Sequence, residues 1–181
     1  GIELRMGGPP VDNGAIDEEG QVTLHRLVGL SLLLGIVLSF LAFRSIKVTF
    51  MVFFVGGTSA VMSLGIVWYT GGSADAILMS MPSLVYVLGL SGAVHIVNYY
   101  RDAVREDGLE GAAERALLHG WWPCTLAAFT TSLGLLSLYN SGLIPIKKFG
   151  LFSAIGVMAS VILLFSYLPA ALTTWPPRFT G

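Results

Sequence analysis

The hydrophobic positions of this chain lie in long uninterrupted blocks, and the polar positions gather in the short segments between them. A helix needs about 20 apolar residues, and at least about 17, to cross a bilayer. Five blocks approach or exceed that length, and they predict membrane-spanning helices at residues 27–43, 48–69, 77–100, 121–138 and 149–172. The pattern therefore predicts an all-α membrane protein with a bundle over residues 24–177 and a short tail at 178–181.

Two longer polar segments flank or interrupt the blocks. Residues 1–23 are rich in turn formers, such as GGPP and DNG, which predicts a loop or the end of an extracytoplasmic domain. Residues 101–120 carry eight charged side chains, and Leu109, Ala113, Ala116 and Leu117 can share one helix face. This segment predicts an amphipathic helix at about 102–118, lying on the cytoplasmic surface of the membrane.

The positions of the basic residues predict the orientation of the bundle, because Lys and Arg gather on the cytoplasmic side of membrane proteins. Alternating spans place six of the ten basic residues on one side: Arg44, Lys47, Arg101, Arg105, Arg115 and Arg178. That side is predicted to be cytoplasmic. The N-terminal segment is then extracytoplasmic and the C-terminus cytoplasmic.

Composition narrows the classes of function. Only 12% of the residues are charged, about half the share in ordinary soluble domains, which favours an integral membrane protein. A net charge of −1 argues against nucleic-acid binding, and a single cysteine excludes an internal disulfide. We find no spacing of metal ligands and expect no catalytic residue or cofactor. The chain begins with Gly1 and has no signal-peptide pattern, so we expect a piece of a longer polypeptide.

The third span, unlike the others, carries polar side chains along one face. Ser91, His95, Asn98 and Asp102 follow one another at spacings of four, three and four, which places them on the same side of a helix. Polar groups at membrane depth are costly and usually face a bundle interior or a water-filled path. Ser91, His95 and Asn98 are therefore candidates for a polar core or a proton relay.

His95 is the candidate proton carrier, because an imidazole gains and loses a proton near neutral pH. Thr130 and Thr131 of the next span are candidates for the same relay. Two alternatives stay open. His95 can be neutral and hydrogen-bonded across the bundle, and the threonine hydroxyls can bond to another helix or to their own helix backbone.

Three stretches carry a resemblance to a known family: GLSGAVHIVNYYRDA, TLAAFTTSLGLLSL and IPIKKFGLFSAIGVMASVILLFSYLPAAL. They resemble the second to sixth helices of one half of a resistance-nodulation-division (RND) transporter. The most similar branch is the MMPL type, which overlaps the sterol-sensing-domain family. The resemblance covers about residues 7–177. It implies a proton-driven exporter of lipids or other hydrophobic molecules in the bacterial inner membrane.

The same resemblance implies partners and a proton carrier. The partners are the lipid bilayer, the hydrophobic substrate and the remainder of the polypeptide, and a homo-oligomer is left open. In much of the branch an Asp carries the proton, in a segment like G-I-S-D-A-V-H. The matching position here is Gly92, which makes this glycine part of the candidate site.

The resemblance leaves two alternative functions open. With Gly92 in place of Asp, the chain can be the non-coupling half of a two-half transporter, or a lipid- or sterol-sensing-like membrane module. The string Gly89-Leu90-Ser91-Gly92 also matches the GxSG serine motif of rhomboid intramembrane proteases. Those enzymes take their histidine from a later helix, and no histidine follows His119 here, so this alternative is remote.

Overall fold

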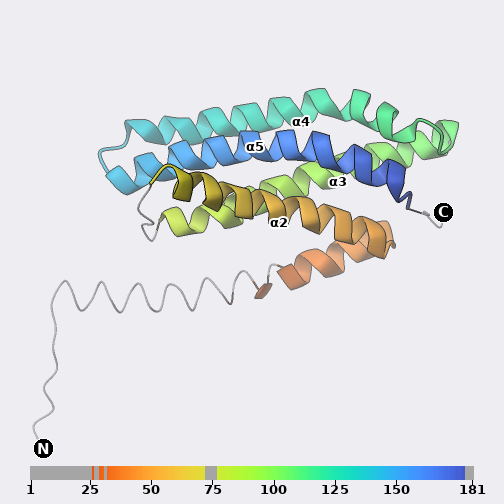
Figure 1. The fold of residues 1–181 in the computed structure, drawn as a ribbon, viewed down its shortest axis with the longest axis horizontal. Coiled ribbons are helices and arrows are strands. Elements are labelled where there is room, and N and C mark those ends of the chain that lie inside the picture. The colour runs from red at the N-terminus through yellow and green to blue at the C-terminus, as the bar shows by residue number, and fades with distance from the viewer. Residues whose placement is uncertain (1–25, 27–28, 31, 72–76, 178–181) are drawn as a thin grey trace, which may run out of the picture. The chain divides into compact units, whose positions relative to one another are not determined.

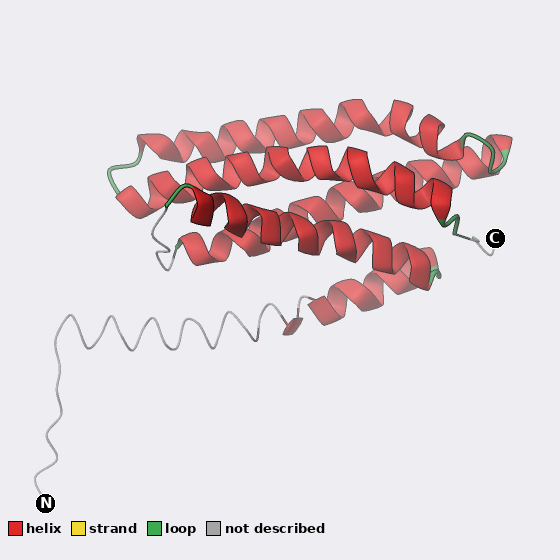
Figure 2. Cartoon of the chain, in the orientation of Figure 1, coloured by secondary structure: helices red, strands yellow, loops and turns green. Residues whose placement is uncertain are grey.

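The computed structural model describes residues 26, 29–30, 32–71 and 77–177. These residues form helices and turns, with no strand among them, which confirms the all-α fold (Figures 1 and 2). The helices are Leu32–Phe43, α2 (Ile46–Tyr69), α3 (Met81–Asp107), α4 (Ala112–Ser137) and α5 (Ile144–Thr174). Short 3₁₀ turns, Leu78–Ser80 and Leu138–Asn140, precede α3 and follow α4. The expectations for residues 1–23 and 178–181 lie outside the described residues.

Three of these helices are long and apolar enough to cross a membrane: Ile46–Tyr69, Leu78–Asp107 and Ile144–Thr174. They contain or overlap the predicted second, third and fifth spans. The helix Leu32–Phe43 is apolar but shorter, and residues 27, 28 and 31 of the predicted first span lie outside the described residues. Helix α4 has Glu114 and Arg115 in its first turns, and its apolar part includes Trp, Ser and Thr. The first and fourth spans stay predictions.

The predicted amphipathic helix at residues 102–118 is wrong as a separate element. Its first residues complete α3 and its last residues begin α4. The chain reverses between them at Gly108 and Gly111, whose φ angles of +81° and +68° lie where glycine is favoured over side-chain-bearing residues. The apolar residues of the segment do not share a face either, because Leu109 is exposed whereas Ala113 and Ala116 are buried.

Helices α3 and α5 form the centre of the bundle, since each contacts the other and both α2 and α4 (Figure 1). Helices α2 and α4 lie on opposite sides of this pair. The main core joins all four helices through buried apolar side chains, including Val48, Val52, Ala93, Ile96, Val97, Ala116, Leu164 and Leu168. This arrangement gives α3 one buried face and leaves its other face next to α4.

Small residues bring α2 and α3 into close contact, as in many membrane helix pairs. A Cβ atom added to Gly56 would lie 3.0 Å from the Tyr86 ring, and one added to Gly89 would lie 3.0 Å from the Ser59 hydroxyl. Other glycines of the bundle meet nothing within 4 Å: Gly57, Gly65 and Gly134. Only some of the glycines in the spans therefore serve helix packing.

Candidate functional site

The polar side chains of α3 share one helix face, as their spacing predicts. Ser91, His95 and Asp102 are exposed and Asn98 is half-buried. The other face of the helix carries the buried residues Gly89, Ala93, Ile96, Val97 and Tyr100. In the described part of the chain, the polar face is thus open to the outside of the bundle rather than fully enclosed within it.

A cavity of about 320 Å³ lies against this polar face, between α3, α4 and α5. Of the six candidate residues, Ser91, Gly92, His95 and Thr131 line it, whereas Asn98 and Thr130 do not. The fold thus brings the hydroxyl, the imidazole and the glycine of α3 to the same space as one threonine of α4.

Three polar or titratable residues that we did not select from the sequence also line the cavity: Tyr99, Cys124 and Ser160. Ser160 is the most buried of them, with an exposed fraction of 3%. A signal for it exists in the sequence, because Gly156, Ser160 and Leu164 follow one another at spacings of four on one face of α5. That periodicity shows which residues share a face but not which neighbour the face meets.

Three hydroxyl groups in or beside the cavity donate to their own helices. Thr130 and Thr131 both donate to the Ala127 carbonyl, at 2.9 and 2.8 Å, and Ser160 donates to the Val157 carbonyl at 2.7 Å. This confirms bonding to the helix backbone, one of the alternatives for the two threonines. A hydroxyl that donates in this way can still accept a hydrogen bond. Thr131 and Ser160 can therefore act as acceptors for a donor in the cavity.

His95 makes no hydrogen bond or ion pair with any other residue in the described part of the chain. Its imidazole is thus not held by a partner across the bundle in this conformation. Beside it, a Cβ atom added to Gly92 would meet only the Leu164 Cδ2 atom, at 2.9 Å. That methyl group is the end of a flexible side chain, so a larger residue at position 92 requires only that the end of Leu164 shifts.

The described residues contain no hydrogen-bonded serine–histidine pair of the kind that an intramembrane serine protease needs. Ser91 makes no hydrogen bond to an imidazole within ranges 32–71 and 77–177. The Nδ1 atom of His119 lies 2.9 Å from the Arg115 carbonyl oxygen instead. The same ranges contain no group of three or more His, Cys, Asp or Glu residues that could hold a metal ion.

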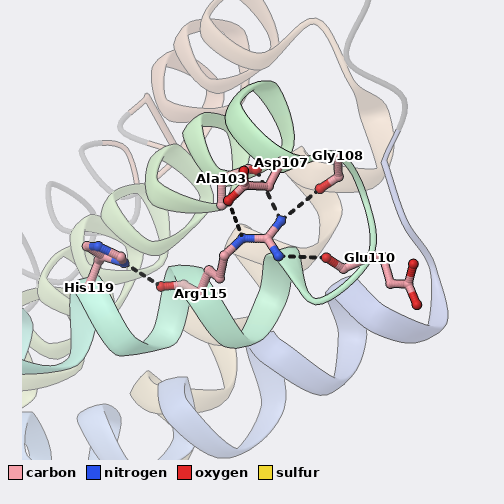
Figure 3. A network of polar contacts seen from close by, with 6 residues as sticks. All are labelled: Ala103, Asp107, Gly108, Glu110, Arg115 and His119. Carbon is pink, nitrogen blue, oxygen red and sulfur yellow. Dashed lines mark hydrogen bonds and ion pairs between the residues drawn. The ribbon is translucent and has the colours of Figure 1, made fainter.

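Arg115 organises the turn between α3 and α4 (Figure 3). Its Nη2 atom donates to the carbonyls of Ala103 and Gly108, at 3.3 and 3.0 Å, and its Nη1 atom donates to the Glu110 carbonyl at 2.7 Å. Its Nε atom lies 3.7 Å from the Asp107 carboxylate. Gly108 and Glu110 follow the last residue of α3, where no helical N–H reaches their carbonyls, so the guanidinium supplies donors to them. The sequence analysis did not select Arg115 for this role.

Replacing Arg115 by alanine is expected to lower the apparent melting temperature of the full-length protein. The change removes three hydrogen bonds from a charged donor at a partly exposed site, a loss of about 1–3 kcal/mol. Arg105→Ala is the control, because Arg105 is exposed in the last turn of α3, on the other side of the same turn. Equal melting temperatures for the two variants would show that the Arg115 contacts contribute nothing to stability.

Comparison with known proteins assigns the chain to a family. The profile of the MMPL family matches residues 1–179. A relative in Streptomyces coelicolor (strain ATCC BAA-471 / A3(2) / M145), named "Putative membrane protein SCO0839", is 22% identical over 191 aligned residues. The alignment covers 98% of this chain but only 27% of that relative. No solved structure gave a significant match.

The family match, which extends over nearly the whole chain, agrees with the apolar helices and with the resemblance of the three sequence stretches. The protein is an integral membrane protein. The chain belongs to the MMPL family, within the RND superfamily.

Proposed function

We propose that this chain is part of a proton-driven exporter of lipids or other hydrophobic molecules in the bacterial inner membrane. The observation that carries the proposal is the cavity in which Ser91, His95 and Thr131 meet. Polar groups at this depth of a membrane helix are costly and usually mark an ion or proton path. Among the lining groups, the imidazole is the one whose ordinary titration range is near neutral pH.

The proposed cycle depends on the change of charge at His95. A protonated imidazole donates from both ring nitrogens, whereas the neutral ring donates from one. The hydroxyl oxygens of Thr131 and Ser160, which already donate to their own helices, are suited to accept from the protonated ring. Moving one charge across the full membrane field supplies about 2.3 kcal/mol per 100 mV. Alternating protonation and release would use this free energy to shift the bundle between two conformations.

We further propose that another part of the same polypeptide covers the polar face of α3. Ser91 and His95 are exposed in the described structure, and direct contact of these groups with lipid would be unfavourable. The chain spans about 27% of the relative that it matches, so a longer polypeptide has enough residues for a second bundle. The proposed orientation places the N-terminal segment outside and the turn at Arg44 and Lys47 in the cytoplasm.

A transport experiment with the full-length protein tests this function. The protein is reconstituted in vesicles with an imposed pH gradient, and movement of a fluorescent phospholipid and of a hydrophobic dye is followed. We expect movement of at least one of these probes to stop when a protonophore removes the gradient. Transport of a probe that continues unchanged after the gradient is removed would contradict proton coupling.

A non-coupling membrane half is the second candidate, and Gly92 is the observation that favours it. No acidic residue is among the cavity-lining residues of the described chain, so the coupling carboxylate of the branch has no counterpart there. Sequencing the complete polypeptide discriminates the two functions. An Asp in a second helix that matches α3 would favour a passive role for this half. A lipid- or sterol-sensing module without transport is the other form of this alternative.

A further inference from the structure

A second hollow lies between α4 and α5, away from the candidate site. It is a groove of about 400 Å³, and its lining is entirely apolar. The walls come from large side chains: the exposed Phe129, Leu133 and Leu136 of α4, and the exposed Ile155 and Ile162 and the half-buried Met158 of α5. Neither His95 nor any other polar residue of α3 takes part in it.

Small residues explain why the groove exists. Ser132 and Ala154 form its buried floor, with exposed fractions of 4% and 3%, and Ala159 lies beside them in the lining. The Ser132 hydroxyl donates to the Ala154 carbonyl at 3.3 Å, which directs its polar atom into the contact between the helices. The floor is therefore apolar in spite of the serine, and the larger side chains stand on both sides of it.

A lysine, Lys147, lies beyond one end of the groove. On α5, Lys147, Leu151 and Ile155 follow one another at spacings of four, so they share one helix face. After α4, Tyr139 comes three residues beyond Leu136, in the 3₁₀ turn. The Lys147 Nζ atom lies 5.8 Å from the centroid of the Tyr139 ring. This contact connects the start of α5 to the turn that follows α4, in the hairpin that these two helices form. Lys147 and Tyr139 do not line the groove itself. Lys147 lies about two helical turns before Ile155, toward the end of the bundle at which α5 begins.

We propose that this groove binds one anionic phospholipid of the surrounding bilayer. An acyl chain occupies the groove between the walls, where it gains close packing contacts that a loosely packed neighbouring lipid lacks. The phosphate of the headgroup pairs with Lys147, as anionic headgroups do with basic residues near the membrane surface. Complementary charge favours a lipid over a second helix, because an apolar helix offers no anion to the lysine. The proposal goes beyond the transport function and does not depend on proton movement at His95.

Native mass spectrometry of the full-length protein, released from mixed phosphatidylglycerol and phosphatidylcholine, tests the site. We expect one phosphatidylglycerol to remain bound to the protein. Ala159→Phe puts a ring into the groove and should reduce retained lipid by at least about tenfold, because a filled site cannot repack without strain. Lys147→Ala should lower the preference for phosphatidylglycerol about fivefold, the factor that corresponds to one lysine near an anionic surface.

Two control variants separate the groove from general effects. Val61→Phe enlarges an exposed apolar residue of α2, and Lys47→Ala removes a lysine that lies 5.1 Å from the Trp175 ring at the opposite end of α5. Both should retain the lipid and its headgroup preference. Unchanged retention in a folded Ala159→Phe protein would overturn the groove as the site, and an unchanged preference in Lys147→Ala would overturn the headgroup contact. A photocrosslinker at Ile155 that labels protein instead of lipid would show that a helix covers the groove.

Discussion

Replacing His95 by glutamine is expected to abolish gradient-driven transport. Glutamine keeps a hydrogen-bonding side chain of similar reach in the cavity, but it cannot take up a proton. Loss of one charge crossing the field removes about 2.3 kcal/mol per 100 mV, which corresponds to roughly a fiftyfold fall in the substrate gradient that the protein can sustain. The measurement is fluorescent-lipid transport by the full-length protein in vesicles, repeated between about pH 6 and 8, where imidazoles titrate.

His119→Gln is the matched control for this experiment. It removes an imidazole that lies near the α3–α4 turn, does not line the cavity and contacts the Arg115 carbonyl. We expect it to transport at the wild-type rate. If His95→Gln also transports at that rate throughout the pH range, the imidazole is not the coupling group, and the non-coupling role of this half gains support.

Adding an acidic residue to the His95→Gln protein provides a rescue test. Gly92 occupies the position that resembles the proton-carrying Asp of the branch, and only the end of Leu164 lies close to a Cβ atom added there. Gly92→Asp should therefore fold once the end of Leu164 shifts, with its carboxylate directed into the cavity. Restored gradient-driven transport in the double variant would show that the cavity supports proton movement by either group. A double variant that folds and stays inactive would show that a carboxylate at position 92 does not substitute for His95.

The largest expected change in stability comes from Gly150→Ala, at the start of α5. A Cβ atom added to Gly150 would clash with the Leu135 backbone carbonyl and would lie 2.8 Å from the Leu138 Cβ atom. Neither atom is at the end of a flexible side chain, so the two helices would have to separate. Overpacking of this kind costs about 1–3 kcal/mol, and more where backbone must shift. A lower apparent melting temperature of the purified full-length protein measures the effect.

Gly134→Ala is the control on the partner helix. No atom lies within 4 Å of the added Cβ atom at this position, although Gly134 is inside α4 of the same hairpin. Alanine is favoured over glycine in a helix by up to about 1 kcal/mol, so this variant should melt at the same or a slightly higher temperature. Equal destabilisation by both variants would mean that the close approach at Gly150 is not what limits stability.

The sequence by itself determined that the chain forms long apolar helices and which side chains share a helix face. Long apolar blocks specify membrane helices whatever their neighbours are, because every backbone polar group must be bonded within the helix. The helical period likewise placed Ser91, His95 and Asn98 on one face of α3, which the structure confirms. The extended resemblance to MMPL proteins was also readable from the sequence, and the family match over residues 1–179 confirms it.

Only the tertiary structure decided which faces meet. Thr131 lines the cavity and its neighbour Thr130 does not, because successive helical residues point about 100° apart and the position of α5 decides between them. Ser160 lines the cavity although it belongs to α5, far along the chain from Ser91 and His95. Arg115 of α4 donates directly to Ala103 of α3, although the sequence had predicted a separate helix between these two. Such contacts depend on how closely the helices approach, which is set by pairs such as Gly150 with Leu135 and Gly89 with Ser59. The period of one helix carries no information about these distances.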